Sequence, residues 1–570
     1  MDNQRNLLLA FGLSALLIFG WSFAMDYFYP QPDQPPQTEA TAPAAAESGT
    51  TTVAGDPGAL DADAAEPTPA GPVDLTAALE DPNRVLIDTP RVAGSINLRG
   101  ARIDDIVLKD YRETVSKDSG PVRLFAPART PDQYFAQFGF YVDGKQIPDN
   151  ALWQADGERL TPDSPVTLTR TDEAGITYSI RLSIDDNYMV TADQSANNAS
   201  EGAAIVQPFA LIDRTSVNAS KDLFIVHSGP VGVFGGTLFD GNNYEELAEL
   251  GRDTPAGTPD WLGFGDHYWL SALIPGEGTV GADVETAGFS SLGGDLFRTA
   301  LIYKPETVPA GGDLTQSTRL FAGAKESQLL DAYADNQGVT EFGLAISWGW
   351  FWFIEKPFLW LLRTLNGLAG NFGVAIILLT VIVRGLMFPI AQKGFASMAS
   401  MKAIQPKMKA IQERYKDDKE KQQQEIMKLY KDEGVNPVAG CLPMLLQIPI
   451  FFALYKVLQL SIEMRHEPFI PFWIRDLSAP DPWNLANALG LIGINVPGYL
   501  MFIFGIGVLA VLLGITMWLT FKLNPSAMDP MQQQIFNLMP WFLMFVMAPF
   551  AAGLLLYWVT SNILTLAQQS

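Results

Sequence analysis

Residues 374–389 read VAIILLTVIVRGLMFP, and Arg384 is the one charged residue in this run. A helix of about 20 apolar residues crosses the hydrocarbon core of a bilayer. The run therefore predicts a membrane-spanning helix over residues 371–392. An arginine this far inside a span costs about 2.5–3.5 kcal/mol on insertion scales, so its charge must be hydrated or paired.

Five other apolar segments have about the length of a span. They are predicted at 6–25, within an uncleaved amino-terminal anchor (1–28), and, within residues 436–570, at 436–462, 499–521, 535–550 and 554–568. The connection at 393–435 carries ten Lys and Arg residues, and such basic loops stay in the cytoplasm. Six spans from a cytoplasmic amino terminus agree with this orientation and place residues 26–347 outside.

Two stretches beside the spans are predicted to lie at the membrane surface. Residues 341–370 contain four tryptophans together with Glu355, Lys356 and Arg363, a mixture that is typical of an interfacial amphipathic helix. Residues 485–498 are apolar but short, and they end in Pro497-Gly498. We expect a surface or re-entrant segment there, because another span would reverse the orientation of every segment after it.

The first 340 residues have a different character. They carry 21 Lys and Arg against 48 Asp and Glu, a net charge of −27, whereas residues 341–570 carry 17 against 14, a net charge of +3. Such an acidic surface repels a polyanion, which argues against DNA as a partner. Residues 29–75 are rich in Pro, Ala, Thr, Asp and Glu and predict a disordered linker. Residues 76–340 contain short alternating runs separated by turns, which predict an antiparallel β-sandwich outside the cytoplasm. Within them, helical spacing appears only near residues 325–333.

Arg384 has no acidic mate in the sequence, because no Asp or Glu lies inside any predicted span. We therefore expect water to solvate it in a cavity open to the cytoplasm; the alternative is a structural arginine bonded to main-chain carbonyls. Thr380, one helical turn earlier, and Gln447, in the third span, could line the same cavity. Further polar candidates in the last two spans are Asn537, Thr560 and Asn562. Taken singly, each of these is better explained by ordinary hydrogen bonding between helices.

The basic connection at 393–435 is predicted to fold as a hairpin of two helices. Spacings of three and four residues place the following on one apolar face of the first helix: Met398, Met401, Ile404, Met408 and Ile411. Methionine adapts to varied apolar partners, so this face could contact hydrophobic substrates. Packing of the two helices against each other explains the same pattern equally well.

Catalytic patterns are missing from the predicted spans. The three histidines, His227, His267 and His466, all lie outside them, and no glycine-rich phosphate loop with a following lysine occurs. Cys441 is alone, so neither an internal disulfide nor a thiolate metal cluster can form. We therefore expect neither an enzyme nor a cofactor. A small-solute transporter or channel also needs a polar cavity inside the membrane and is the alternative function.

Several motifs together resemble the YidC branch of the membrane-protein insertase family (YidC/Oxa/Alb), in the Gram-negative form with a large periplasmic domain. They are VIVRG at 381–385, NP at 436–437, GCLP at 440–443, QIPIF at 447–451, DPMQQ at 529–533 and LYWVTSN at 556–562. His267-Tyr268-Trp269, followed by Ile274-Pro275, also fits. The resemblance covers nearly the whole chain.

The resemblance implies a bacterial inner-membrane protein that inserts nascent membrane proteins and helps them fold. It implies that Arg384 lies in a hydrophilic groove open to the cytoplasm, with Thr380 and Gln447 as polar neighbours and Tyr557 near the groove wall. Clients would leave along the third and fifth spans into the lipid bilayer. The implied partners are the Sec translocon and ribosome–nascent chain complexes, and no cofactor is implied.

Taken together, the sequence predicts an α+β multi-domain membrane protein. Its parts are a periplasmic antiparallel β-sandwich and a polytopic α-helical membrane domain with a cytoplasmic helical hairpin. Six spans are expected, five of which form the insertase core.

Overall fold

The computed structural model describes residues 73–570, except for 117, 221–226, 277–282, 350, 417, 435–436, 485–504, 524–529 and 570. The predicted amino-terminal anchor (1–28), nearly all of the predicted linker (29–75) and the predicted surface segment (485–498) lie outside the described residues.

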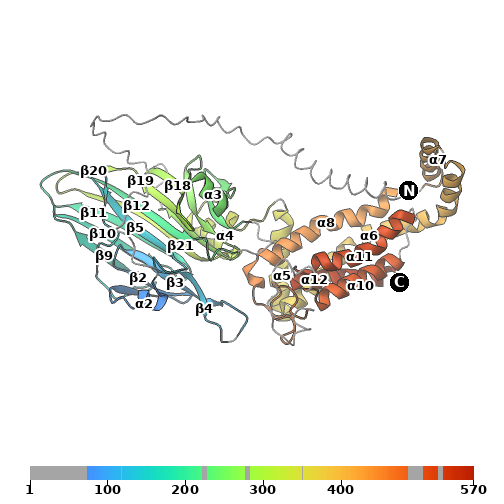
Figure 1. The fold of residues 1–570 in the computed structure, drawn as a ribbon, viewed down its shortest axis with the longest axis horizontal. Coiled ribbons are helices and arrows are strands. Elements are labelled where there is room, and N and C mark those ends of the chain that lie inside the picture. The colour runs from blue at the N-terminus through green and yellow to red at the C-terminus, as the bar shows by residue number, and fades with distance from the viewer. Residues whose placement is uncertain are drawn as a thin grey trace, which may run out of the picture. The chain divides into compact units, whose positions relative to one another are not determined.

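The β domain is built from two sheets (Figure 1). The first sheet consists, in spatial order, of β15 (Arg252–Asp253), β18 (Val284–Gly293), β19 (Leu296–Tyr303), β12 (Ala204–Thr215), β5 (Tyr134–Val142), β3 (Arg102–Arg112), β2 (Val92–Asn97), β1 (Arg84–Asp88) and β8 (Arg159–Leu160), with β20 (Glu306–Val308) beside β12, β4 (Pro121–Phe125) beside β3 and β6 (Lys145–Gln146) beside β5. The second consists of β14 (Thr237–Phe239), β13 (Gly229–Phe234), β16 (Pro259–Gly265), β17 (Trp269–Pro275), β21 (Asp313–Ala324), β11 (Met189–Asn198), β10 (Ile176–Ile184), β9 (Val166–Thr171) and β7 (Gln154–Ala155). Among the described strands, β1 and β8 form the one parallel pair.

Alternating side chains explain why these segments form strands. In β10, Tyr178, Ile180 and Leu182 are buried while the residues between them are more exposed, as a half-buried strand requires. Residues from both sheets, such as Phe138 of β5 and Phe321 of β21, belong to one apolar core. The predicted β domain is confirmed.

Among the described residues of the β domain, three helices accompany the sheets, whereas the sequence predicted helical spacing near residues 325–333 alone. That prediction corresponds to α4 (Ser327–Gln337); α2 (Leu75–Leu79) and α3 (Tyr244–Leu250) were not predicted. Both are too short to display a helical period. A local signal did exist for α3, because Asn243 and Glu246 form a reciprocal capping box at its amino end.

The remainder of the chain is helical. Its helices are the 3₁₀ turns η2 (Phe342–Ala345) and η3 (Ile462–Met464) and the α-helices α5 (Trp352–Ala369), α6 (Phe372–Arg414), α7 (Lys419–Asp432), α8 (Pro437–Leu460), α10 (Val508–Leu523), α11 (Pro530–Met547) and α12 (Ala552–Gln569). Helix α6 packs against α5, α8 and α12, and α10 packs against α11 and α12.

Helix α6 differs from its prediction. The sequence placed a span at 371–392 and a separate hairpin helix after it, but the structure has one helix of 43 residues. Pro389 and Pro406 lie inside it. Each proline removes one backbone hydrogen bond without ending the helix, because the helix formers on both sides continue the backbone path.

Helix α5 confirms a helix in the segment predicted to be interfacial (341–370), although it begins later than predicted. Trp352, Phe353 and Trp360 are exposed. Glu355, by contrast, is 1% exposed, and Arg363 is paired with Glu463. The aromatic face is therefore the outer face of this helix, and two of its polar residues face the protein.

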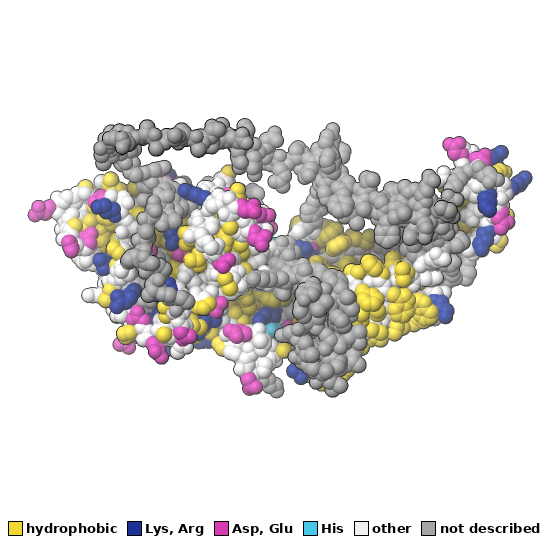
Figure 2. Space-filling view, in the orientation of Figure 1, with side chains coloured by type: hydrophobic (Ala, Val, Ile, Leu, Met, Phe, Trp, Pro, Cys, Tyr) yellow, Lys and Arg dark blue, Asp and Glu magenta, His cyan; other side chains and the backbone are white. Residues whose placement is uncertain are grey.

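Among the described residues, one helical stretch, Phe372–Met401, is long and apolar enough to cross a bilayer by itself. Shorter apolar stretches occur at Leu445–Leu460, Val508–Leu523 and Asn537–Met547. Figure 2 shows hydrophobic side chains gathered over the helices, whereas charged side chains are scattered over the β domain. The helical carboxyl-terminal region is thus confirmed, and the six spans stay a prediction.

Candidate functional site

The polar cluster of the helical region is centred on Arg384. Its Nε donates a hydrogen bond to Ser561 Oγ at 2.8 Å, and its Nη2 donates to the same oxygen. Ser561 lies in α12 and is 1% exposed, and Arg384 is half-buried. Among the described residues, neither a carboxylate nor a main-chain oxygen pairs with the guanidinium.

This geometry adds a partner that was not predicted individually. The Ser561 hydroxyl accepts hydrogen bonds from two guanidinium nitrogens of Arg384, and the hydration of Arg384 by water stays a prediction. The hydroxyl is neutral, so no described residue compensates the positive charge. Ser561 was not predicted individually, although it belongs to the LYWVTSN motif and lies one helical turn after Tyr557.

Gln447 and Tyr557 form the second part of the cluster. Gln447 Nε2, in α8, donates to Tyr557 OH, in α12, at 2.5 Å. Tyr557 is 1% exposed, and Gln447 Oε1 is buried with no hydrogen-bond partner among the described residues. Such an acceptor is costly to bury dry, so this position favours a water molecule or another polar group as its partner. Three helices, α6, α8 and α12, thus contribute to the cluster.

Other predicted polar residues satisfy their own helices. Thr380 is fully buried and donates to Ile376 O at 2.7 Å, and Thr560 donates to Leu556 O at 2.7 Å. This i−4 bonding is the usual solution for a threonine inside a helix. Asn537 is exposed on α11. The structure therefore unites Arg384, Gln447 and Tyr557 but not Thr380, Thr560 or Asn537.

Helices α8 and α11 are not among the closely packed pairs of described helices. Helix α8 packs against α5, α6 and α12, and α11 packs against α10. Both carry exposed apolar side chains, which are Leu445, Ile448 and Phe452 on α8 and Leu538, Phe542 and Phe545 on α11.

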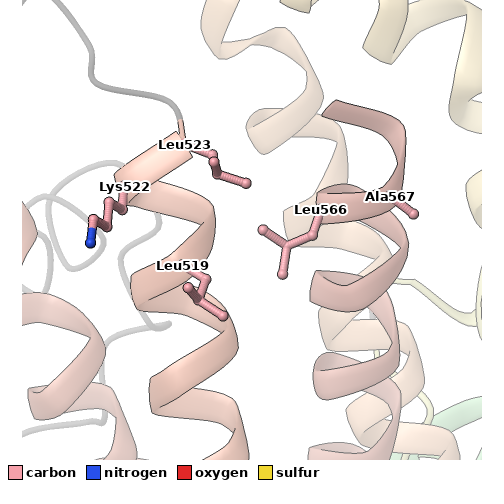
Figure 3. A pocket seen from close by; sticks show the side chains of 5 residues that line it. All are labelled: Leu519, Lys522, Leu523, Leu566 and Ala567. Carbon is pink, nitrogen blue, oxygen red and sulfur yellow. The ribbon is translucent and has the colours of Figure 1, made fainter. Parts of the chain in front are cut away.

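A cavity of about 630 Å³ separates the carboxyl ends of α10 and α12 (Figure 3). Its lining is Leu519, Lys522, Leu523, Leu566 and Ala567. The Lys522 ammonium points away from the cavity and lies 4.7 Å from the ring centre of Trp518. The cavity surface is therefore essentially aliphatic.

Helix α7 packs back on the end of α6. Tyr430 OH donates to Met408 Sδ at 3.4 Å, and Gln422 Nε2 donates to Gln412 O at 2.9 Å. Met408 is buried, Met401 and Ile411 are half-buried, and the side chain of Met398 lies outside the described residues. Part of the methionine face is thus used to join the two helices.

The part of the chain that the structure describes contains no cluster of side chains suited to bind a metal ion. No group of three or more His, Cys, Asp and Glu side chains is arranged there to hold an ion. What the cluster around Arg384 offers is hydrogen bonding and positive charge.

Two family descriptions match this chain. "60Kd inner membrane protein" matches residues 364–570, and "YidC periplasmic domain" matches residues 84–361. The boundary between them falls inside α5, after the β domain and before the helices that form the cluster.

Individual relatives agree. The "Membrane protein insertase YidC" of Beijerinckia indica is 42% identical over all of this chain and 95% of its own length. The protein of the same name from Zymomonas mobilis is 41% identical over 99% of this chain and 94% of its own. A solved structure, "Active YidC insertase crystal structure with the first transmembrane domain resolved", is 18% identical, with a TM-score of 0.35, and covers 86% of this chain and 92% of that one. None of these similarities supports a small-solute transporter or channel. This chain belongs to the YidC family of membrane protein insertases.

Proposed function

We propose that the protein inserts hydrophobic segments of new proteins into the inner membrane through a groove whose polar wall contains Arg384, Ser561, Gln447 and Tyr557. The observation that carries this proposal is the half-buried guanidinium, whose described hydrogen-bond acceptor is a single neutral hydroxyl. A positive charge of this kind attracts water and acidic groups, and it costs free energy in a dry bilayer. Thr380, Asn537 and Thr560, which bond elsewhere or are exposed, would have a secondary part.

The proposed mechanism needs no covalent chemistry and no cofactor. A polar flank of the client enters the groove from the cytoplasm, and the positive charge favours acidic flanks. The distance that this flank crosses through hydrocarbon is thereby shortened. The apolar part of the client moves between α8 and α11 into lipid, where burial provides about 25 cal/mol per Å² of apolar area.

We further propose the topology and partners that this function requires. The anchor (1–28) begins in the cytoplasm, the linker (29–75) and β domain (76–340) are periplasmic, and 341–370 lies at the membrane surface. The second span (371–392) leads to a cytoplasmic hairpin (393–435), and 436–570 contain the last four spans. Membrane proteins are the clients, and the Sec translocon and ribosome–nascent chain complexes are proposed partners. The excess of positive charge at 393–435 supports this orientation.

Photo-crosslinking tests the groove. Benzoylphenylalanine replaces Gln447 in one variant and Leu386, which is 77% exposed on α6, in a matched control. We expect a stalled membrane-protein chain to be captured several times more efficiently at 447, and Arg384→Ala to lower that capture most for clients with acidic flanks. Equal capture at both positions contradicts a groove at this cluster.

A further inference from the structure

The turn between β16 and β17 contains a motif that the proposed function leaves without a role, His267-Tyr268-Trp269. Asp266, which precedes it, is buried and paired with Arg214 at 2.5 Å. Asp266 also accepts a hydrogen bond from His267 N at 2.8 Å, and its own N–H donates to Trp269 O at 2.9 Å. A buried ion pair therefore fixes the backbone of this turn.

Two side chains of the turn reach the end of α8. His267 Nε2 donates to Gln459 O at 2.7 Å, and Tyr268 OH is 3.5 Å from the same oxygen. The two rings are stacked, with centres 3.8 Å apart. Because Gln459 is in the last turn of α8, its carbonyl has no partner within the helix. The β domain thus caps the carboxyl end of α8.

A second contact reinforces the cap just beyond α8. The Arg465 guanidinium lies 5.3 Å from the ring centre of Trp269 and donates to Glu113 O, at the end of β3, at 3.2 Å. Trp269 in turn packs edge-to-face against Tyr111, with ring centres 5.3 Å apart. The chain after α8 is therefore held by a cation–π contact as well as by a hydrogen bond.

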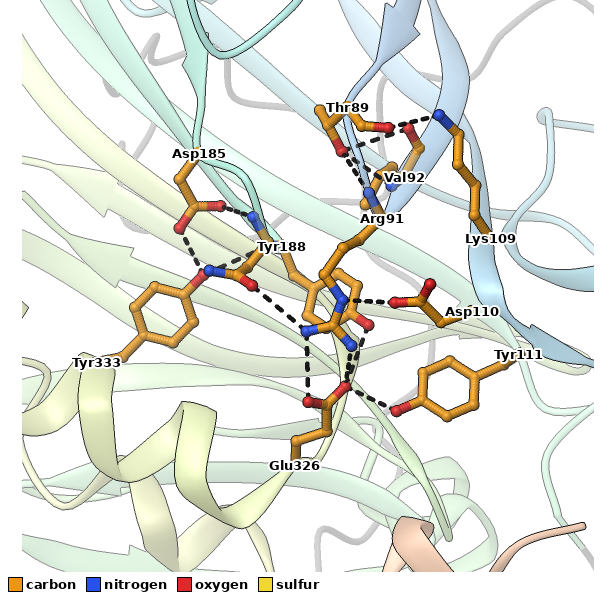
Figure 4. Close-up of polar contacts among 11 residues, drawn as sticks. Thr89, Arg91, Val92, Lys109, Asp110, Tyr111, Asp185, Tyr188, Glu326 and Tyr333 are labelled. Carbon is orange, nitrogen blue, oxygen red and sulfur yellow. Dashed lines mark hydrogen bonds and ion pairs between the residues drawn. The ribbon is translucent and has the colours of Figure 1, made fainter. Parts of the chain in front are cut away.

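A third contact passes through α5. Arg363 pairs with Glu463, in η3, and donates to Ser327 Oγ at 3.0 Å. Ser327 follows Glu326, whose carboxylate is bound by Arg91, by Tyr111 OH at 2.7 Å and by Tyr188 OH at 3.2 Å (Figure 4). The β-domain side of these contacts is thus itself a tightly bonded network.

These contacts act on the helix that carries Gln447. Gln447 precedes Gln459 by 12 residues, which is about 18 Å along α8. Among the described helices α8 is not closely packed against α11, so its position is set by α5, α6, α12 and the contacts at its carboxyl end. We propose that His267 and Tyr268 are positioning residues for insertion, which hold α8 at the distance from α11 that lets a client pass. This proposal rests on the function proposed above.

A purely structural role for the contact between His267 and Gln459 is the alternative explanation. Both explanations predict a loss of thermal stability when the His267 side chain is removed. They differ in the spacing of α8 and α11, which changes only if His267 positions α8. The test therefore measures both the distance between α8 and α11 and the rate of client insertion.

The experiment uses the full chain with Cys441→Ala, reconstituted in liposomes, and spin labels at Leu445→Cys in α8 and Leu538→Cys in α11, both exposed positions. Its variants are His267→Leu, which removes the donor, and His267→Gln, which retains one. The matched control is His227→Leu, because His227 Nε2 makes a similar 2.7 Å contact, with Pro230 O, inside the β domain. If the His267→Leu protein does not accumulate in cells, Arg465→Met takes its place in the experiment, because it removes the cation–π contact with Trp269 at the same end of α8.

We expect His267→Leu to lower the initial insertion rate at least threefold and to shift or broaden the distance between the labels. His267→Gln restores both, and His227→Leu changes neither. Slower insertion with an unchanged distance, or wild-type behaviour of His267→Leu, overturns the proposal. If the wild-type protein inserts no more client than protein-free liposomes, the proposed function itself fails, which is a separate outcome.

Discussion

Glu355 is an ionisable residue in a buried environment that disfavours its charged form. It lies in α5 with 1% of its surface exposed, and its Oε2 has no hydrogen-bond partner among the described residues. Burial raises the pKa of Glu355 to about 7, although the positive charge of Lys456 acts in the opposite direction. Lys456 itself donates to Ser347 O at 2.9 Å, just before α5. Near neutral pH this carboxyl group is therefore partly protonated.

The raised pKa predicts a pH-dependent stability. The folded protein binds this proton more tightly than the unfolded chain, whose carboxyl titrates near 4.5. The stabilisation is therefore full below about pH 4.5 and is lost as the pH rises through about 7. Between pH 5 and pH 8 we expect the melting temperature of the wild type to fall by roughly 5–10 °C more than that of Glu355→Gln. The raised pKa corresponds to about 2–3 kcal/mol over this range, and each 1 kcal/mol shifts the melting temperature by about 2–4 °C in a domain of about 200 residues.

Thermal unfolding in detergent at a series of pH values measures this difference. Glu201→Gln is the control, because Glu201 is exposed in the connection before β12. If the curves for Glu355→Gln and the wild type stay parallel across this range, Glu355 does not titrate as described.

The site was partly predictable at the scale of single residues. Arg384 stands out because it is the one charge in an apolar run, and Gln447 and Tyr557 belong to motifs with a strong resemblance. Ser561 could not be found in this way, because one serine among many carries no signal and its partner is 177 positions away. Thr380 lies one turn before Arg384, and its hydroxyl donates to the carbonyl of Ile376 one turn earlier still; its part in the groove stays a prediction.

At the scale of elements, the close pairing of β16 with β17 supports the His267 turn. A Cβ at Gly263, in β16, would lie 1.8 Å from the backbone oxygen of Ser271 and 2.7 Å from Ala272 Cα. Both atoms belong to the neighbouring strand, so a methyl group requires the backbone itself to move. Glycine is needed here because of this close approach.

Gly263→Ala should therefore destabilise the β domain by about 1–3 kcal/mol, the usual cost of forcing an extra methyl group into a packed core. Hydrogen exchange of the β16 and β17 amides, followed by mass spectrometry, detects the loss locally. Gly241→Ala is the matched control, since no atom lies within 4 Å of its added Cβ. Equal protection in the two variants would show that the strands separate without cost.

Helices and strands were predictable where the hydrophobic pattern continues over many residues. The alternation in β10 and the apolar runs of α6, α8, α10 and α12 all predicted an element of the right kind. Helices α2 and α3 were missed because they are short. The continuity of α6 was missed because the end of the apolar run and the start of the basic segment suggested two separate helices, whereas the backbone continues through both. Which helices would pack together, and that α8 and α11 would not, depends on contacts that a single sequence does not contain.

At the scale of the whole molecule, the β domain has a charged surface suited to water, and the helices have an apolar surface suited to lipid. The first 340 residues carry a net charge of −27, and the helices expose many large apolar side chains (Figure 2). An exposed apolar surface of this extent requires lipid around it. The same substitution should therefore be costly on the helical surface and nearly neutral on the β domain.

Leu386 and Leu250 test this difference, because both are exposed leucines on helices, at 77% and 56%. Leu386→Asp, on α6, should cost up to about 3 kcal/mol in the membrane. Leu250→Asp, on α3, should change stability by less than about 0.5 kcal/mol. The readouts are the membrane-integrated fraction after alkaline extraction and the melting temperature in nanodiscs. A tolerated Leu386→Asp would argue that water, not lipid, surrounds this face.

Helix α6 also has a mechanical consequence. Since the backbone runs unbroken from Phe372 to Arg414, Arg384 and the basic segment after residue 393 sit on one continuous rod. Twisting or tilting one end carries the other with it, and bending is easiest at Pro389 and Pro406, where a backbone hydrogen bond is lost. A partner that binds and tilts the basic end of α6 therefore also moves the half-buried guanidinium of Arg384.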